Sequence, residues 1–94
     1  MKVFYDPAFY EKLKKVDVRI RRSVKEKILI FSENAHDTGL NNHPLEKEYT
    51  GYYSINITAD WRALYKEVQQ GTEIIAYFVL LGRHKQLYGK DKVK

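Results

Sequence analysis

The chain has 94 residues, of which 44% are apolar, and it contains no cysteine. This composition is typical of one folded domain, and it excludes disulfides, zinc–thiolate sites and cysteine nucleophiles. A formal charge of +5 and a pI of about 9.4 favour an anionic partner such as nucleic acid or an acidic protein. No long apolar run follows the first residues, so we expect a cytoplasmic protein without a signal peptide or membrane span.

A short strand at residues 2–5 and two amphipathic helices are predicted in the first third of the chain. Asp6 is a candidate N-cap for a helix that ends near residue 16, and Pro7 suits its first turn. Asp17 is a candidate N-cap for a second helix at 18–34. This helix carries one apolar stripe, formed by Ile20, Val24, Ile28 and Phe31. Two such helices in tandem indicate a helical hairpin packed on a flat surface.

Three strands are predicted after a polar loop at residues 35–51. Residues 52–58 and 61–68 alternate between two faces, and residues 73–81 are apolar on both faces, which is typical of a central strand covered on both sides. A turn at 69–72 joins the last two strands. The predicted order is β-α-α-β-β-β, an α+β fold in which the helical hairpin packs on one face of a small, mostly antiparallel sheet.

The other face of this sheet is predicted to be open, because its alternate positions do not suit a core. These positions are Ser54, Asn56, Arg62 and Lys66. The chain is read as one domain over residues 1–94, and residues 90–94 are predicted to form a flexible tail.

The three histidines differ in what their surroundings suggest. His36 is expected to be a solvated loop residue, and His43 is either a loop cap or a site residue. His84 follows the last predicted strand between Arg83 and Lys85, where it suits proton transfer near neutral pH. No metal motif, glycine-rich phosphate loop or serine-hydrolase signature occurs, so any enzyme of this sequence is expected to need no metal or cofactor.

Metal-free cleavage of RNA needs few groups, and the chain has residues of those types. A base helps the ribose 2′-OH attack the phosphate, cations stabilise the charge of the transition state, and an acid protonates the departing 5′-oxygen. Tyr88 adds an aromatic face on which a base can rest. The candidate acids, bases and cations are His43, Asp60, Arg62, Arg83 and His84. Taken singly, each also has an ordinary alternative, such as a turn residue, a solvated arginine or a packing aromatic.

Two stretches carry a resemblance to a known family. "HPLEKEYTGYYSINITADWRALYK" and, after an apolar strand, "LGRHKQLYGK" resemble the RelE/ParE superfamily of toxins from bacterial and archaeal toxin–antitoxin pairs. The YafQ-like messenger-RNA interferases of that superfamily show H-P-L before the sheet, D-W at the second hairpin strand and G-x-H-x-x-L with a Phe or Tyr at the end. The resemblance covers most of residues 43–89 and implies a RelE-like fold. It also implies a ribosome-dependent endoribonuclease that cuts mRNA in the A site, and an antitoxin partner that blocks or distorts the site.

The resemblance also implies roles for single residues. His84 matches the general acid, Asp60 and His43 match residues that activate or orient the nucleophile, and Tyr88 matches the residue that stacks or orients the substrate. Arg62 matches a strand arginine of RelE-type relatives.

Three further positions complete the implied site. Arg83 is a plausible phosphate contact. Asn56 stands where the YafQ-like pattern often has a histidine, and Lys47 stands where it usually has a glycine. We include Asn56 and Lys47 among the candidate substrate-binding residues. The role of general base stays open, because Asn56 cannot titrate.

Two other functions remain open at this point. One is a ParE-like inhibitor of DNA gyrase without nuclease activity, and the other is a binding module that has lost activity. ParE-like chains generally lack an ending like His84 and Tyr88, which favours the nuclease. The basic residues of the two helices are either a solvated surface or contacts to ribosomal RNA. They are Lys12, Lys14, Lys15, Arg19, Arg21, Arg22, Lys25 and Lys27.

Overall fold

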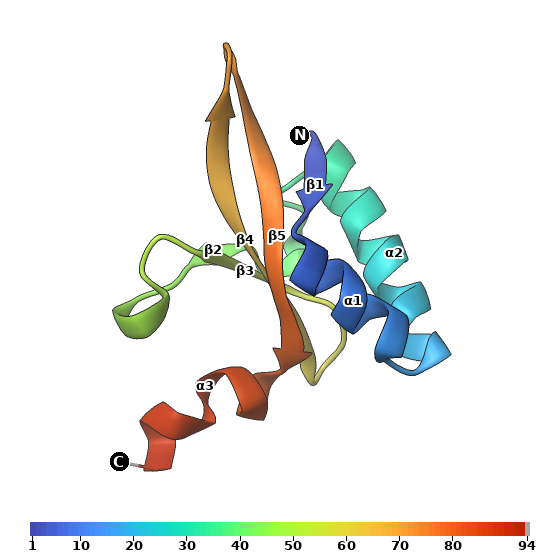
Figure 1. Cartoon of the computed structure of the whole chain (residues 1–94), viewed down its shortest axis with the longest axis vertical. Helices are drawn as coiled ribbons and strands as arrows, with labels where there is room; N and C mark the ends of the chain where they lie inside the picture. The colour runs from blue at the N-terminus through green and yellow to red at the C-terminus, as the bar shows by residue number, and fades with distance from the viewer. Residues whose placement is uncertain (94) are drawn as a thin grey trace.

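The computed structural model describes the backbone of residues 1–93 and the side chains of residues 1–88. The elements are β1 (Val3–Tyr5), α1 (Pro7–Lys15), α2 (Val18–Glu33), η1 (Thr38–Leu40), β2 (His43–Pro44), η2 (Lys47–Tyr49), β3 (Tyr53–Asn56), β4 (Trp61–Gln70), β5 (Glu73–Arg83) and α3 (His84–Val93), where η marks a short 3₁₀ helix. Helices α1 and α2 lie together on one side of the sheet, and α3 follows the end of β5 at a distance from them (Figure 1).

The five strands form one mixed, open sheet in the order β1-β5-β4-β3-β2. β1 pairs with β5 in parallel, and the other three pairings are antiparallel. The predicted α+β fold with a mostly antiparallel sheet is therefore confirmed. Four elements were not predicted, namely the two-residue strand β2, the short helices η1 and η2, and the helix α3. β5 lies inside the sheet as expected, although β4 is the middle strand.

The helical hairpin begins and turns where the sequence indicates. The side chains of Asp6 and Asp17 each accept a hydrogen bond from the main-chain N–H two residues along, at 2.8 and 2.7 Å. Each bond satisfies one of the N–H groups that a helix start leaves unpaired. The Arg21 guanidinium closes the hairpin, because it donates to three main-chain oxygens at the end of α1 at 3.0 to 3.2 Å. Arg21 therefore stabilises the hairpin as well as adding to its positive charge.

The core lies between the helical hairpin and the inner face of the sheet. Phe31 of α2 is fully buried, and its ring meets Tyr65 and Phe78 edge-on at centroid distances of 4.9 and 5.4 Å. The predicted stripe of α2 supplies much of this core. Val24, Ile28 and Phe31 are buried, and Ile20 packs at the margin.

The outer face of the sheet is open only in part. Lys66 is exposed as predicted, Asn56 and Arg62 are half-buried, and Ser54 is buried. Ser54 and Leu64 are 1% and 0% exposed. α3 packs on β5, and Leu87 lies so near Gly82 that an added Cβ at that glycine would be 3.3 Å from Leu87 Cδ2. The prediction was wrong at Ser54 because alternation along a strand shows that two faces exist, but not which later segment covers them.

The predicted tail is also different. Residues 90–93 continue α3, and residue 94 lies outside the described residues. The sequence does not signal this helix, because residues 84–93 carry little apolar surface and contain Gly89, a weak helix former. Within residues 1–93, no helix has the length and apolar character that crossing a bilayer requires.

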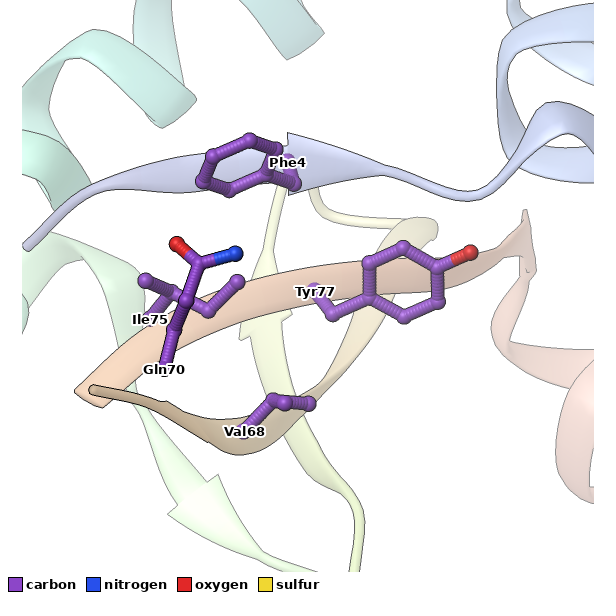
Figure 2. A pocket seen from close by; sticks show the side chains of 5 residues that line it. All are labelled: Phe4, Val68, Gln70, Ile75 and Tyr77. Atoms are coloured by element: carbon purple, nitrogen blue, oxygen red, sulfur yellow. The ribbon is translucent and has the colours of Figure 1, made fainter. Parts of the chain in front are cut away.

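An apolar groove of about 290 Å³ lies on the outer face toward the tip of the β4–β5 hairpin (Figure 2). Its lining comes from three strands and consists of Phe4, Val68, Gln70, Ile75 and Tyr77. Phe4 and Val68 are 43% and 39% exposed. β4 has a strand neighbour on only one side here, because its pairing with β3 ends at Tyr65. The groove is thus an exposed apolar surface at the opposite end of β5 from α3.

Candidate functional site

Three candidate residues meet where β5 ends and α3 begins: the neighbours Arg83 and His84, and Asp60 from the turn before β4. The main-chain N–H of His84 donates to the main-chain oxygen of Asp60 at 2.7 Å, which ties the first residue of α3 to the turn between β3 and β4. The Asp60 Oδ2 lies 3.6 Å from Nε of Arg83. We call Asp60, Arg83 and His84 the site corner. It brings the Asp60 carboxylate beside the Arg83 guanidinium, and it joins the main chain of Asp60 to that of His84 at one end of the sheet.

Arg83 is held loosely enough to accept another partner. Its side chain and that of Asp60 are 58% and 57% exposed, and an exposed ion pair of this kind contributes little to stability. The guanidinium also lies over the Trp61 ring, 5.9 Å from the ring centroid. A phosphate can therefore replace the Asp60 carboxylate at small cost, since arginine binds both anions with the same planar set of donors.

Tyr88 lies one helical turn after His84 and contacts its ring. The two ring centroids are 4.7 Å apart with an interplanar angle of 65°. The Tyr88 ring also meets Tyr49 edge-on, with the centroids 5.8 Å apart. Its hydroxyl lies 3.4 Å from the hydroxyl of Ser54, a long distance for such a bond. Tyr88 thus packs against aromatic groups on two sides and lies beside the imidazole.

Arg62 braces the turn that carries Asp60. Its Nη1 donates to three main-chain oxygens of that turn, those of Thr58, Ala59 and Trp61, at 2.9, 3.3 and 3.0 Å. Arg62 also pairs across the strands with Asn56 on one side and Gly82 on the other. The residue therefore keeps a positive charge next to the site corner, and its hydrogen bonds give it a structural role as well.

Asn56 is a half-buried residue that pairs with Arg62 across the strands. Its Oδ1 is buried and accepts no hydrogen bond within the described part of the chain. Buried acceptors of this kind are uncommon, because an unpaired polar group costs free energy. A neutral amide at this position leaves proton transfer to other residues.

His43 and Lys47 come from the segment on the far edge of the sheet. His43 lies in β2 opposite Ser54. Its Nδ1 is 2.8 Å from the Asn41 main-chain oxygen, and a carbonyl oxygen only accepts hydrogen bonds. Nδ1 of the neutral ring therefore carries the proton, and Nε2 is the basic nitrogen. Lys47 is exposed in η2, with a left-handed φ of 58°. His43 and Ser54 are thus paired on neighbouring strands. The Lys47 side chain is not part of the site corner.

His36 is exposed in the loop after α2, as the sequence predicts. Among the residues that the structure describes, no three histidine, aspartate or glutamate side chains form a group that could hold a metal ion.

The sequence did not point to Tyr49 or to the helix that it contacts. The Tyr49 hydroxyl donates to the main-chain oxygen of Leu87 at 2.9 Å. The one available signal was the run of tyrosines at residues 49–53, which is unusual in a segment otherwise polar enough to be a loop.

The fold is shared with solved bacterial toxins. YafQ from E. coli strain BL21(DE3) aligns with a TM-score of 0.73 and 21% identity over 94% of this chain and 98% of that one. A YoeB/ParE toxin from Agrobacterium tumefaciens aligns with a TM-score of 0.70 and 21% identity over 89% of this chain and 99% of that one. The E. coli DinJ–YafQ toxin–antitoxin complex also aligns, with a TM-score of 0.70 and 21% identity over 94% and 97% of the two chains.

No protein-family model matches the sequence, and no curated protein is significantly similar to it. The structural likeness spans almost the whole of each chain. The protein therefore has the same fold as these toxins, the RelE-like fold that the H-P-L, D-W and terminal histidine motifs implied.

Proposed function

We propose that this protein is the toxin of a type II toxin–antitoxin pair and that it cleaves mRNA on the ribosome. The observation that carries the proposal is the site corner, where Asp60, Arg83 and His84 meet. These residues are of the types that metal-free cleavage of RNA needs. The fold likeness to YafQ and to a YoeB/ParE toxin supports the same function.

In the proposed mechanism, a base takes the proton of the ribose 2′-OH as its oxygen attacks the adjacent phosphorus. The P–O5′ bond breaks, a 2′,3′-cyclic phosphate forms, and His84 gives its proton to the departing 5′-oxygen. His43 is the first candidate base, because its Nε2 is the basic nitrogen. Asp60 is the second, and its other role is to orient Arg83.

The remaining candidates bind the substrate or stabilise charge. Arg83 contacts the scissile phosphate, and Arg62 adds positive charge while it holds the turn. Tyr88 stacks against a base or orients it. Lys47 and Asn56 are assigned to the surrounding substrate contacts.

The decisive experiment for the activity is primer extension on translated mRNA after the protein is induced in cells. Cuts inside codons are expected. The alternative is a ParE-like gyrase inhibitor, because one protein of the same fold is a YoeB/ParE toxin from Agrobacterium tumefaciens. Intact mRNA together with inhibited DNA supercoiling would favour that alternative.

The first variant to test is His84→Ala. We expect cleavage to fall by about 100-fold or more, the usual scale for the loss of a general acid. The matched control is His36→Ala, which removes an exposed loop histidine. Cleavage by His84→Ala at the level of this control would remove His84 from the mechanism. His43→Gln and Asp60→Asn then distinguish the two candidate bases, because the true base is expected to show the larger loss.

We also propose a cognate antitoxin as protein partner, and the ribosome and its mRNA as targets in the cytoplasm. The antitoxin is supported by the toxin–antitoxin complex of the same fold and by the exposed groove of Figure 2, since apolar surfaces of this kind commonly bind partner chains. The basic face of α1 and α2 supports contacts with ribosomal RNA.

A further inference from the structure

The position of α3 decides where two candidate site residues lie, because α3 carries both His84 and Tyr88. A ten-residue helix is not stable by itself in water and needs tertiary contacts. Two such contacts come from the sheet. The His84 N–H donates to Asp60 at the start of the helix, and Leu87 packs where Gly82 has no side chain.

A third contact comes from the loop on the opposite side of the site. The Tyr49 hydroxyl donates to the Leu87 main-chain oxygen at 2.9 Å, a good length for a bond of this type. The Tyr49 ring also meets Tyr88 at an interplanar angle of 89°, the edge-to-face geometry that aromatic pairs prefer. One side chain therefore contacts the helix through both its polar and its apolar parts.

Tyr49 is itself held firmly in place. Its main-chain N–H donates to Glu46 at 3.1 Å, and its main-chain oxygen accepts from Tyr52 at 2.9 Å. The Tyr52 ring packs against it edge-on at 6.1 Å. The ends of the loop are joined by a bond from the Leu45 N–H to the Tyr52 oxygen, also at 2.9 Å. The loop thus presents Tyr49 to α3 from a fixed frame.

We propose that Tyr49 is a positioning residue that holds α3 against the sheet and so fixes His84 and Tyr88 for catalysis. It connects the two sides of the site, because its loop continues from His43 in β2 and its hydroxyl reaches the helix that begins at His84. This inference rests on the proposed function for its catalytic consequence, whereas the holding of α3 is testable without any activity.

The first measurement is hydrogen exchange of the main-chain amides of residues 88–92, which lie beyond the unpaired first turn of α3 and are paired inside the helix. Tyr49→Phe keeps the ring and removes the hydrogen bond, so exchange is expected to become about fivefold faster, the scale of one hydrogen bond. Tyr49→Leu also removes the aromatic contact, so a larger increase of about tenfold or more is expected. The matched control is Tyr10→Phe, which removes a hydroxyl from a side chain on α1 that is 52% exposed.

The second measurement is the steady-state cleavage of mRNA on ribosomes. The expected loss of kcat follows the same order, with Tyr49→Leu losing most, Tyr49→Phe partly restoring activity and Tyr10→Phe matching the unchanged protein. The loss is expected mainly in kcat, because the acid His84 is displaced, with a smaller rise in KM, because α3 also carries the substrate contact Tyr88. Thermal unfolding is expected to change little, since Tyr49 is outside the main core.

The outcomes separate the explanations. Unchanged exchange in both Tyr49 variants would overturn the proposal. A raised KM with unchanged exchange would also overturn it, because Tyr49 would then be a substrate contact. If the unaltered protein cleaves no mRNA, the proposed function is contradicted. Faster exchange in the Tyr49 variants would then still show that Tyr49 holds α3.

Discussion

The two faces of the sheet are built from different kinds of contact. The inner face packs against two helices whose caps and apolar stripes are local features, such as Asp17 and Phe31. The outer face is covered in part by α3, which has little apolar surface and is held by a few contacts with Gly82, Asp60 and Tyr49. All three residues of the site corner lie where this outer layer begins.

Because the contacts of the two faces differ, we expect the inner face to determine stability and the outer face to determine function. A large apolar core provides most of the free energy of folding, and the loss of one core ring is costly. A short helix held by a few polar and aromatic contacts contributes less to folding, but it places the imidazole of His84. Substitutions on the inner face are therefore expected to act on stability, and substitutions beneath α3 on catalysis.

The largest effect is expected from Phe31→Ala on the inner face. The substitution removes a fully buried ring that packs against Tyr65 and Phe78, and it should lower the free energy of unfolding by about 3–5 kcal/mol. Urea unfolding measures this loss. Leu29→Ala on the same helix is the control, because Leu29 is 62% exposed and its truncation should cost little. Equal losses in the two variants would contradict the placement of the core.

A smaller and different effect is expected from Gly82→Val on the outer face. A side chain here meets Leu87 at a distance that is already tight for one carbon, so α3 must shift. We expect overpacking of this kind to lower stability by about 1–3 kcal/mol, and the shifted His84 to lower cleavage more than that loss of folded protein explains. Gly82→Ala should show a milder form of both changes. Normal cleavage by Gly82→Val, measured where the variant is fully folded, would show that the position of α3 does not control activity.

The smallest effect is expected on the basic helix surface, which belongs to neither face of the sheet. Arg22 and Lys25 line a shallow cavity of about 270 Å³ beside Val18 and Arg21. Arg22→Glu with Lys25→Glu should weaken ribosome binding and reduce its dependence on salt, by a slope of about 0.9 for each lost phosphate contact. Binding measured across a salt series tests this. The matched control is Arg22→Lys with Lys25→Arg, which changes both side chains and keeps both positive charges. Unchanged binding after charge reversal would remove this surface from the interface.

The features of the inner face could be predicted from the sequence better than those of the outer face. The caps Asp6 and Asp17 and the turn at Gly71 could be read from the sequence, because each acts on neighbours within a few residues. The β4–β5 hairpin also forms where the turn residues indicate. By contrast, Ser54 was predicted to be exposed and is buried, because the helix that covers it begins far along the chain, at His84.

The candidate site shows the same limit. The residue types of Asp60, Arg83 and His84 could be selected from the sequence, and the structure places them together. The contact between Tyr49 and Leu87 could not be foreseen, since it joins residues 38 positions apart and neither was assigned a role in the motifs. Lys47 was grouped with the site by resemblance, and its side chain is exposed in η2, outside the site corner.

The sequence by itself determined the helical hairpin, the strand order along the chain, the positive charge and the residue types of the site, because periodicity, capping and charge are properties of neighbouring residues. Only the tertiary structure decided that α3 forms and folds back over Ser54, that Arg62 braces the turn of Asp60, and that Tyr49 reaches Leu87. The physical reason is that each of these depends on which distant surfaces meet, and a weakly apolar helix gains its stability from those contacts rather than from its own residues.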